Sequence, residues 1–139
     1  PHRVVSIGAS IGADGAVDGC YLFNDAGEGG TCIGALSLSP GNYLTEAFTY
    51  ADAAGMIDQS GFPVWCLAAV KDYESPDVCR SISGEFSRTF IFPGGAHGMD
   101  LISPEEYPDE PLADLNTMQI IQEFLETATG IQLNEVHLP

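Results

Sequence analysis

Four short apolar runs, separated by segments with helical character, are the feature that most constrains the fold of this 139-residue chain. The apolar runs cover residues 3–7, 31–39, 64–70 and 88–92, and the helical segments cover residues 13–24, 45–58, 75–86 and 114–130. The runs are apolar on both faces, which is typical of strands that helices cover on both sides. The alternation predicts an α/β fold with a parallel sheet of about four strands flanked by helices on both faces.

Length and composition predict one domain over residues 1–139, with 45% hydrophobic residues to build its core. No run approaches the ~20 apolar residues that a transmembrane helix needs. Twenty acidic residues against four Lys and Arg give a net charge of -16. Such a charge repels nucleic-acid phosphates and anionic lipid headgroups, so neither is expected as a partner.

The four cysteines bear on the compartment and on metal binding. They form no CxxC pair and have no histidine at zinc-like spacing, so a zinc site is not expected. The acidic 103–111 loop lacks the regular alternation of a calcium loop, so a calcium site is not expected either. No cofactor is expected. Cys20 and Cys32 are the first pair to test for a disulfide, whereas Cys66 lies in an apolar run and is expected to be a buried thiol. An even cysteine count in an acidic, lysine-poor chain favours an exported protein, extracellular or at the cell surface.

Three residues whose side chains could carry out chemistry come just after predicted strands. Ser10 follows the first strand, Asp72 the third and His97 the fourth. Because the carboxyl ends of parallel strands meet at one edge of a sheet, we expect these side chains to converge. Their chain order is that of a triad in which serine is the nucleophile, histidine the base, and aspartate the residue that orients the imidazole. Asp77 and Glu74 are alternatives for the carboxylate.

The segment IGASIGADGAV, at residues 7–17, fits a nucleophile elbow. Gly8 and Gly12 flank Ser10 in the G-x-S-x-G spacing, which sets the serine on a tight turn between a strand and a helix. We expect glycine at both positions because β-carbons would collide where the strand and helix approach. The N–H of Ile11 then becomes a donor to an oxyanion. The structural alternative is a glycine-rich turn in which the serine caps the helix.

Together with LSLSPGNY, PVWCLAAVKDYES and FPGGAHGMDLI, this segment resembles the C-terminal half of an α/β-hydrolase, and most of all the bacterial exported or lipoprotein-type esterase-like hydrolases. The resemblance implies a serine hydrolase that acts on small-molecule carboxylic esters or related acyl compounds through an acyl-enzyme. It assigns Ser10 as the nucleophile, His97 as the general base and Asp72 as the acid. It also assigns the N–H of Ile11 as an oxyanion donor.

The chain departs from that family in what precedes the elbow. Several strands normally come first, with a loop that supplies a second oxyanion donor, whereas here the motif serine is residue 10. The first strand is therefore expected to leave a bare, apolar sheet edge, which soluble proteins avoid. Three explanations stay open: a fragment, one half of a two-chain hydrolase, or a subunit that pairs its edge with another copy or another protein. The last includes a noncatalytic structural or binding subunit with a hydrolase-like fold.

Overall fold

The computed structural model describes residues 2–44, 47–102 and 117–133. In this part of the chain four strands form one sheet: β1 (His2–Ala9), β2 (Gly30–Leu38), β3 (Val64–Ala69) and β4 (Ser87–Phe92). The strands lie in the order β1-β2-β3-β4, and each neighbouring pair is parallel. The prediction of an α/β fold with a four-stranded parallel sheet is confirmed.

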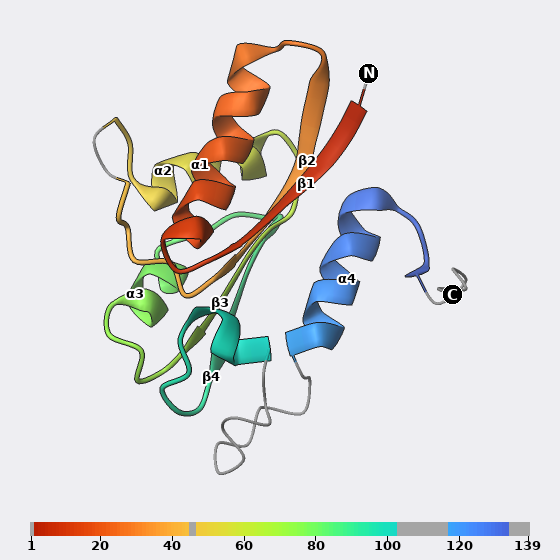
Figure 1. Cartoon of the computed structure of the whole chain (residues 1–139). Helices are drawn as coiled ribbons and strands as arrows, with labels where there is room; N and C mark the ends of the chain where they lie inside the picture. Colours follow the sequence, from red (N-terminus) through yellow and green to blue (C-terminus); the bar gives the residue numbers. More distant parts are fainter. Residues whose placement is uncertain (1, 45–46, 103–116, 134–139) are drawn as a thin grey trace.

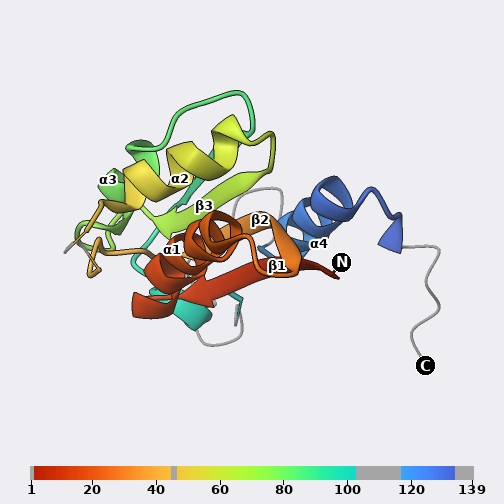
Figure 2. The ribbon, with the colours of Figure 1, turned by 90° about the horizontal axis from the view of Figure 1, so that it is seen from above.

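Helices cover both faces of the sheet, as Figures 1 and 2 show. One face packs against α1 (Ile11–Ala26), α2 (Tyr50–Gln59) and α3 (Ser75–Arg80), and the other packs against the 3-10 helix η1 (Gly98–Ile102) and α4 (Thr117–Thr129). Alternate residues of the central strands enter the two resulting core layers. Ala35 and Cys66 face the first layer, whereas Leu36 and Leu67 face the second. Both faces of the central strands β2 and β3 are covered, and these two strands are therefore mostly apolar and almost entirely buried.

Two helices are shorter than the sequence predicted. α2 begins at Tyr50 rather than near residue 45, because Thr49 and Asp52 form a capping box in which each side chain accepts the backbone N–H of the other residue. α3 ends at Arg80 instead of continuing to residue 86. The chain leaves the helix there and turns toward β4 through Gly84, which has a φ of 141°.

The last helix agrees better with its pattern. Gly130, with a φ of 73°, follows the final residue of α4 and ends the helix, as glycine does in the left-handed region. Residues 114–116, where the helix was expected to start, lie outside the described residues. Within the described part of the chain, no helix is long and apolar enough to cross a membrane.

Two disulfides lie in the layer under α1, α2 and α3. Cys20 and Cys32 join α1 to β2, which confirms the pair that the sequence put first. Cys66 is not a free thiol but is bonded to Cys79, which joins β3 to α3. The expectation for Cys66 was wrong because an apolar run predicts the burial of a sulfur but not which residue faces it across the layer.

β1 is an edge strand. It pairs with β2 on one side, and no described strand lies on the other. Val4 and Ile7 on this strand are 41% and 42% exposed. The expected apolar edge is therefore present in the described structure, directly beneath the turn that carries Ser10.

Candidate active site

Ser10 occupies the turn between β1 and α1 in a strained backbone conformation. Its φ is 56° and its ψ is -126°, a combination that costs a residue with a β-carbon about 1–3 kcal/mol. Two hydrogen bonds hold this backbone: the N–H of Ser10 donates to the carbonyl of Leu38, and its carbonyl accepts from Ala13, both at 2.9 Å. The side chain makes no capping bond to the helix. The turn therefore has the backbone strain expected of a nucleophile elbow, and the serine side chain does not cap the helix.

The two motif glycines have different roles. A β-carbon at Gly8 would overlap the backbone carbonyl of Gly12, so the close approach of β1 and α1 requires glycine at position 8. A β-carbon at Gly12 would meet no atom within 4 Å. The steric prediction is right for Gly8 and wrong for Gly12, because Gly12 presents its carbonyl to the strand while its α-carbon faces open space.

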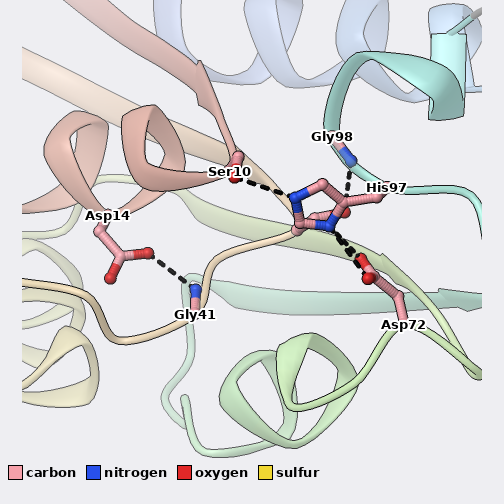
Figure 3. Close-up of polar contacts among 7 residues, drawn as sticks. Ser10, Asp14, Gly41, Asp72, His97 and Gly98 are labelled. Carbon is pink, nitrogen blue, oxygen red and sulfur yellow. Dashed lines mark hydrogen bonds and ion pairs between the residues drawn. The ribbon is translucent and has the colours of Figure 1, made fainter.

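The three side chains predicted from the strand ends meet (Figure 3). His97 Nε2 lies 2.9 Å from Ser10 Oγ, and His97 Nδ1 lies 2.7 Å and 3.0 Å from the two carboxylate oxygens of Asp72. Because a carboxylate only accepts hydrogen bonds, the ring proton belongs on Nδ1. Nε2 is then free to accept the proton of the Ser10 hydroxyl.

Burial differs across this chain of hydrogen bonds. Asp72 is 3% exposed, whereas the side chain of His97 is 41% exposed. The carboxylate is thus shielded from water, which strengthens its interaction with a positively charged imidazole. The imidazole remains accessible from solvent.

The two alternative carboxylates, and the histidine of β1, are not part of this arrangement. Asp77 forms an exposed ion pair with Arg80 at 3.3 Å, and Glu74 occupies the position before α3. His2 begins β1, at the opposite end of the strand from Ser10. The hydrogen-bond partners of the His97 ring are Ser10 and Asp72, as the strand-end argument predicted.

The N–H of Ile11, the predicted oxyanion donor, lies at the N-terminus of α1. Ile11 is the first residue of α1, where a backbone N–H has no acceptor within the helix. The nearby N–H of Gly98 is already committed, because it donates to Ser39 Oγ at 2.8 Å. A second oxyanion donor is therefore not supplied by Gly98 in this arrangement.

Sequence reasoning missed two polar residues that fasten the loops around the triad. Ser39 Oγ accepts the N–H of Gly98, and the carboxylate of Asp14 accepts the N–H groups of Gly41, at 3.0 Å, and of Tyr43. Both residues are fully or almost fully buried. Each is a polar residue within an apolar stretch, which was the available signal. The local pattern does not reveal the partner of Ser39, because Gly98 lies 59 residues away in the chain.

A second group of polar residues lies under α1. Burial, with a smaller effect of Asp14, raises the pKa of Asp18 to about 6. Burial also raises the pKa of the Tyr50 hydroxyl. Asp18 lines a cavity of about 380 Å³ together with Leu22, Tyr43, Leu44, Ala47 and Phe48. Ser10, Asp72 and His97 do not line this cavity, so the raised pKa of Asp18 does not belong to the site at Ser10.

In the residues that the structure describes, no group of three or more His, Cys, Asp or Glu side chains could hold a metal ion. The acidic 103–111 loop lies outside these residues. Comparisons of the chain with protein-family models, with curated proteins and with solved structures give no match. The geometry of the site is therefore the basis for a functional proposal, and the α/β-hydrolase resemblance stays a prediction.

Proposed function

We propose that this protein is a serine hydrolase that cleaves carboxylic esters or related acyl compounds through an acyl-enzyme. One observation carries the proposal: two hydrogen-bonded contacts link Ser10, His97 and a buried Asp72, which come from three separate strand ends. A hydroxyl, an imidazole and a carboxylate in this order activate serine as a nucleophile. The strained backbone of Ser10 is independent support, because such strain clusters at functional sites.

In the acylation step, Ser10 Oγ attacks the carbonyl carbon of the ester while His97 Nε2 takes the hydroxyl proton. Asp72 stabilises the imidazolium that forms, and the N–H of Ile11 donates to the oxyanion. The C–O bond of the ester then breaks, and the leaving alcohol receives the proton from Nε2. The product of this step is an acyl group esterified to Ser10.

Deacylation follows the same path with water as the nucleophile. His97 Nε2 takes a proton from water as the water oxygen attacks the acyl carbon. The bond to Ser10 Oγ breaks, Oγ recovers the proton from Nε2, and a carboxylic acid leaves. Every proton moves between the substrate, water, Ser10 and His97, so the reaction needs no cofactor.

We also propose that the protein works in an oxidising compartment, extracellular or at the cell surface. Its two disulfides support this, since such bonds persist mainly outside the reducing cytosol. The open edge of β1 is further proposed to pair with a preceding segment, a second chain or another copy of this chain. Such a strand would end beside Ser10 and could bring the second oxyanion donor.

A noncatalytic structural or binding subunit is the second candidate, and the β1 edge is the observation that favours it. Apolar side chains are exposed on β1, and beside it lies a hollow of about 360 Å³ lined by His2, Arg3, Val4, Val5, Ile33, Thr129 and Ile131. Unpaired strand edges are templates for association with another chain. In this case the triad would be a relic within an assembly.

A fluorophosphonate probe, which reacts with activated serines, separates the two candidates. We expect one probe adduct by intact mass, at Ser10 by peptide mapping, and none in Ser10→Ala. Asp72→Asn should slow labelling about 10³-fold or more, because it removes the charge that orients and stabilises the imidazole. Ser6→Ala, a serine substitution in β1, the strand that precedes Ser10, is the matched control and should label like wild type.

One result of this labelling experiment would contradict the hydrolase function. Folded wild-type protein that shows no adduct at Ser10, with its two disulfides intact, would exclude the hydrolase function. An oligomer seen by light scattering in the same unlabelled sample would then favour the noncatalytic subunit.

A further inference from the structure

The loop that carries His97 is held by backbone contacts, among them the N–H of Lys71, which donates to the carbonyl of Gly94 at 2.8 Å. His97 lies between the end of β4 at Phe92 and the start of η1 at Gly98, and its side chain is 41% exposed. Packing around the ring therefore gives it limited support. Asp72 orients the ring through Nδ1 but does not determine where the backbone of residue 97 lies. The backbone contacts next to His97 decide how far Nε2 stands from Ser10.

Ser39 supplies such a contact from the end of β2. It is fully buried, and its Oγ accepts the N–H of Gly98 at 2.8 Å. Its own N–H donates to the carbonyl of Leu67 in β3, also at 2.8 Å. The hydroxyl that holds the residue after His97 is thus itself fixed to a central strand of the sheet.

The residue before Ser39 holds the nucleophile. The carbonyl of Leu38 accepts the N–H of Ser10 at 2.9 Å. The last residue of β2 and the residue that follows it therefore bind the backbone of Ser10 and of Gly98, one on each side of the reacting pair. Gly98 also lies against the elbow, since a β-carbon built there would stand 3.6 Å from Ala9 Cβ and 3.8 Å from Ser10 N.

The loop after Ser39 is fastened as well. Asp14, in the helix that follows the nucleophile, accepts the N–H groups of Gly41 and Tyr43, and Figure 3 shows its bond to Gly41 beside the triad. Asn42 Oδ1 accepts the N–H of Tyr50 at the start of α2, at 2.9 Å. Ser39 consequently sits between two fixed points, the sheet on one side and α1 with α2 on the other.

We propose that Ser39 is a positioning residue of the hydrolase site: its buried hydroxyl, by binding the N–H of Gly98, holds His97 Nε2 at hydrogen-bond distance from Ser10 Oγ. This inference rests on the proposed function. It extends that function beyond the triad to a fourth side chain, which does not touch substrate. Displacement of a reacting group by about 1 Å can cost a factor of 10², so a single backbone anchor can affect the rate.

The chain offers a matched control for this role. Ser37 is also fully buried, lies two residues earlier in β2, and donates through Oγ to a backbone carbonyl, that of Ala13, at 3.0 Å. Ser39→Ala and Ser37→Ala each delete one buried hydroxyl and one hydrogen bond to the backbone. Only Ser39→Ala removes a contact to the loop that carries His97.

The first experiment compares the rate of fluorophosphonate labelling of Ser10 at saturating probe. We expect Ser39→Ala to react about tenfold more slowly than wild type and Ser37→Ala to stay within about twofold. Ser39→Gly should match Ser39→Ala, because both lack the hydroxyl. Since Ser39 has a φ of 58°, which glycine adopts without strain, Ser39→Gly also keeps the test open if Ser39→Ala does not fold.

A proton NMR measurement gives a readout that does not need activity. The Nδ1–H of His97, bonded to Asp72, is expected to give a sharp low-field signal in wild type and in Ser37→Ala. It should broaden in both Ser39 variants because the ring is no longer held in one position. Wild-type protein that shows the signal but fails to label would count against the proposed function alone.

Two results would overturn the positioning role. One is a Ser39→Ala variant that labels at the wild-type rate with an unchanged His97 signal. The other is a wild-type rate in Ser39→Gly alongside slow labelling in Ser39→Ala, since backbone strain and not the hydroxyl would then explain the loss.

Discussion

The Ser10→Gly variant should be more stable than the Ser10→Ala variant. At most positions the alanine variant is the more stable of the two. In the interior of a strand or helix, glycine is less stable than alanine by about 0.5–1 kcal/mol, because the unfolded chain is freer. Ser10, however, has a φ of 56° and a ψ of -126°, which costs any residue with a β-carbon about 1–3 kcal/mol. Glycine removes that cost and alanine keeps it.

The expected difference in stability between the two variants is the backbone strain minus the usual glycine penalty. Both variants lose the hydrogen bond between Ser10 Oγ and His97 Nε2, so its contribution cancels. Subtraction of the glycine penalty from the strain leaves Ser10→Gly more stable than Ser10→Ala by roughly 1 kcal/mol. The same pair of substitutions at Ser6, where φ is not positive, should show glycine the less stable. The gap between the two positions is the strain itself, about 2 kcal/mol.

Urea unfolding of the oxidised protein measures these free energies. Trp65 is the only tryptophan of the chain and is 2% exposed, so its fluorescence reports the loss of the core. If Ser10→Gly proves less stable than Ser10→Ala by the margin found at Ser6, the elbow stores no strain. The assignment of Ser10 to a nucleophile elbow would then lose its second support.

Two further predictions concern the elbow and the core. Gly8→Ala should lower the free energy of unfolding by about 1–3 kcal/mol and abolish probe labelling, whereas Gly12→Ala should label normally and be at least as stable as wild type in urea; equal effects of the two substitutions would contradict the asymmetry. Asp18 has a pKa raised from 3.8 to about 6 in the folded protein, so the fold binds its proton more tightly and loses stability as pH rises through that window. Urea unfolding should therefore show that Asp18→Asn raises the free energy of unfolding more at pH 8 than at pH 3, by up to about 3 kcal/mol. A difference between variant and wild type that does not change with pH would refute the raised pKa.

The strands were predictable because both of their faces are covered. An apolar run bounded by turn residues has few other uses in a soluble chain, and the register of the central strands sends Leu36 and Leu67 to one layer and Ala35 and Cys66 to the other. Helix ends were less predictable. The start of α2 depends on the reciprocal bonds of Thr49 and Asp52, which compete with other polar residues upstream that look equally suitable as caps.

The convergence of the triad was predictable from topology alone. Ser10, Asp72 and His97 each follow a strand, and a parallel sheet brings such positions to one edge. The support around them was not predictable, because it depends on single pairs of atoms. Nothing in the local sequence of Ser39 indicates that its hydroxyl meets the N–H of Gly98. The open space beside Gly12 likewise depends on the angle at which α1 leaves the turn.

The two disulfides affect the order in which the parts of the molecule unfold. All four cysteines belong to the layer beneath α1, α2 and α3, whereas the layer beneath α4 is held by apolar contacts such as that between Trp65 and Phe124. Ala96 and Leu101, which flank His97, belong to the layer without a covalent tie. Mild heating of the oxidised chain would thus separate the His97 imidazole from the Ser10 hydroxyl while much of the sheet survives, so the proposed activity would be lost before the protein unfolds.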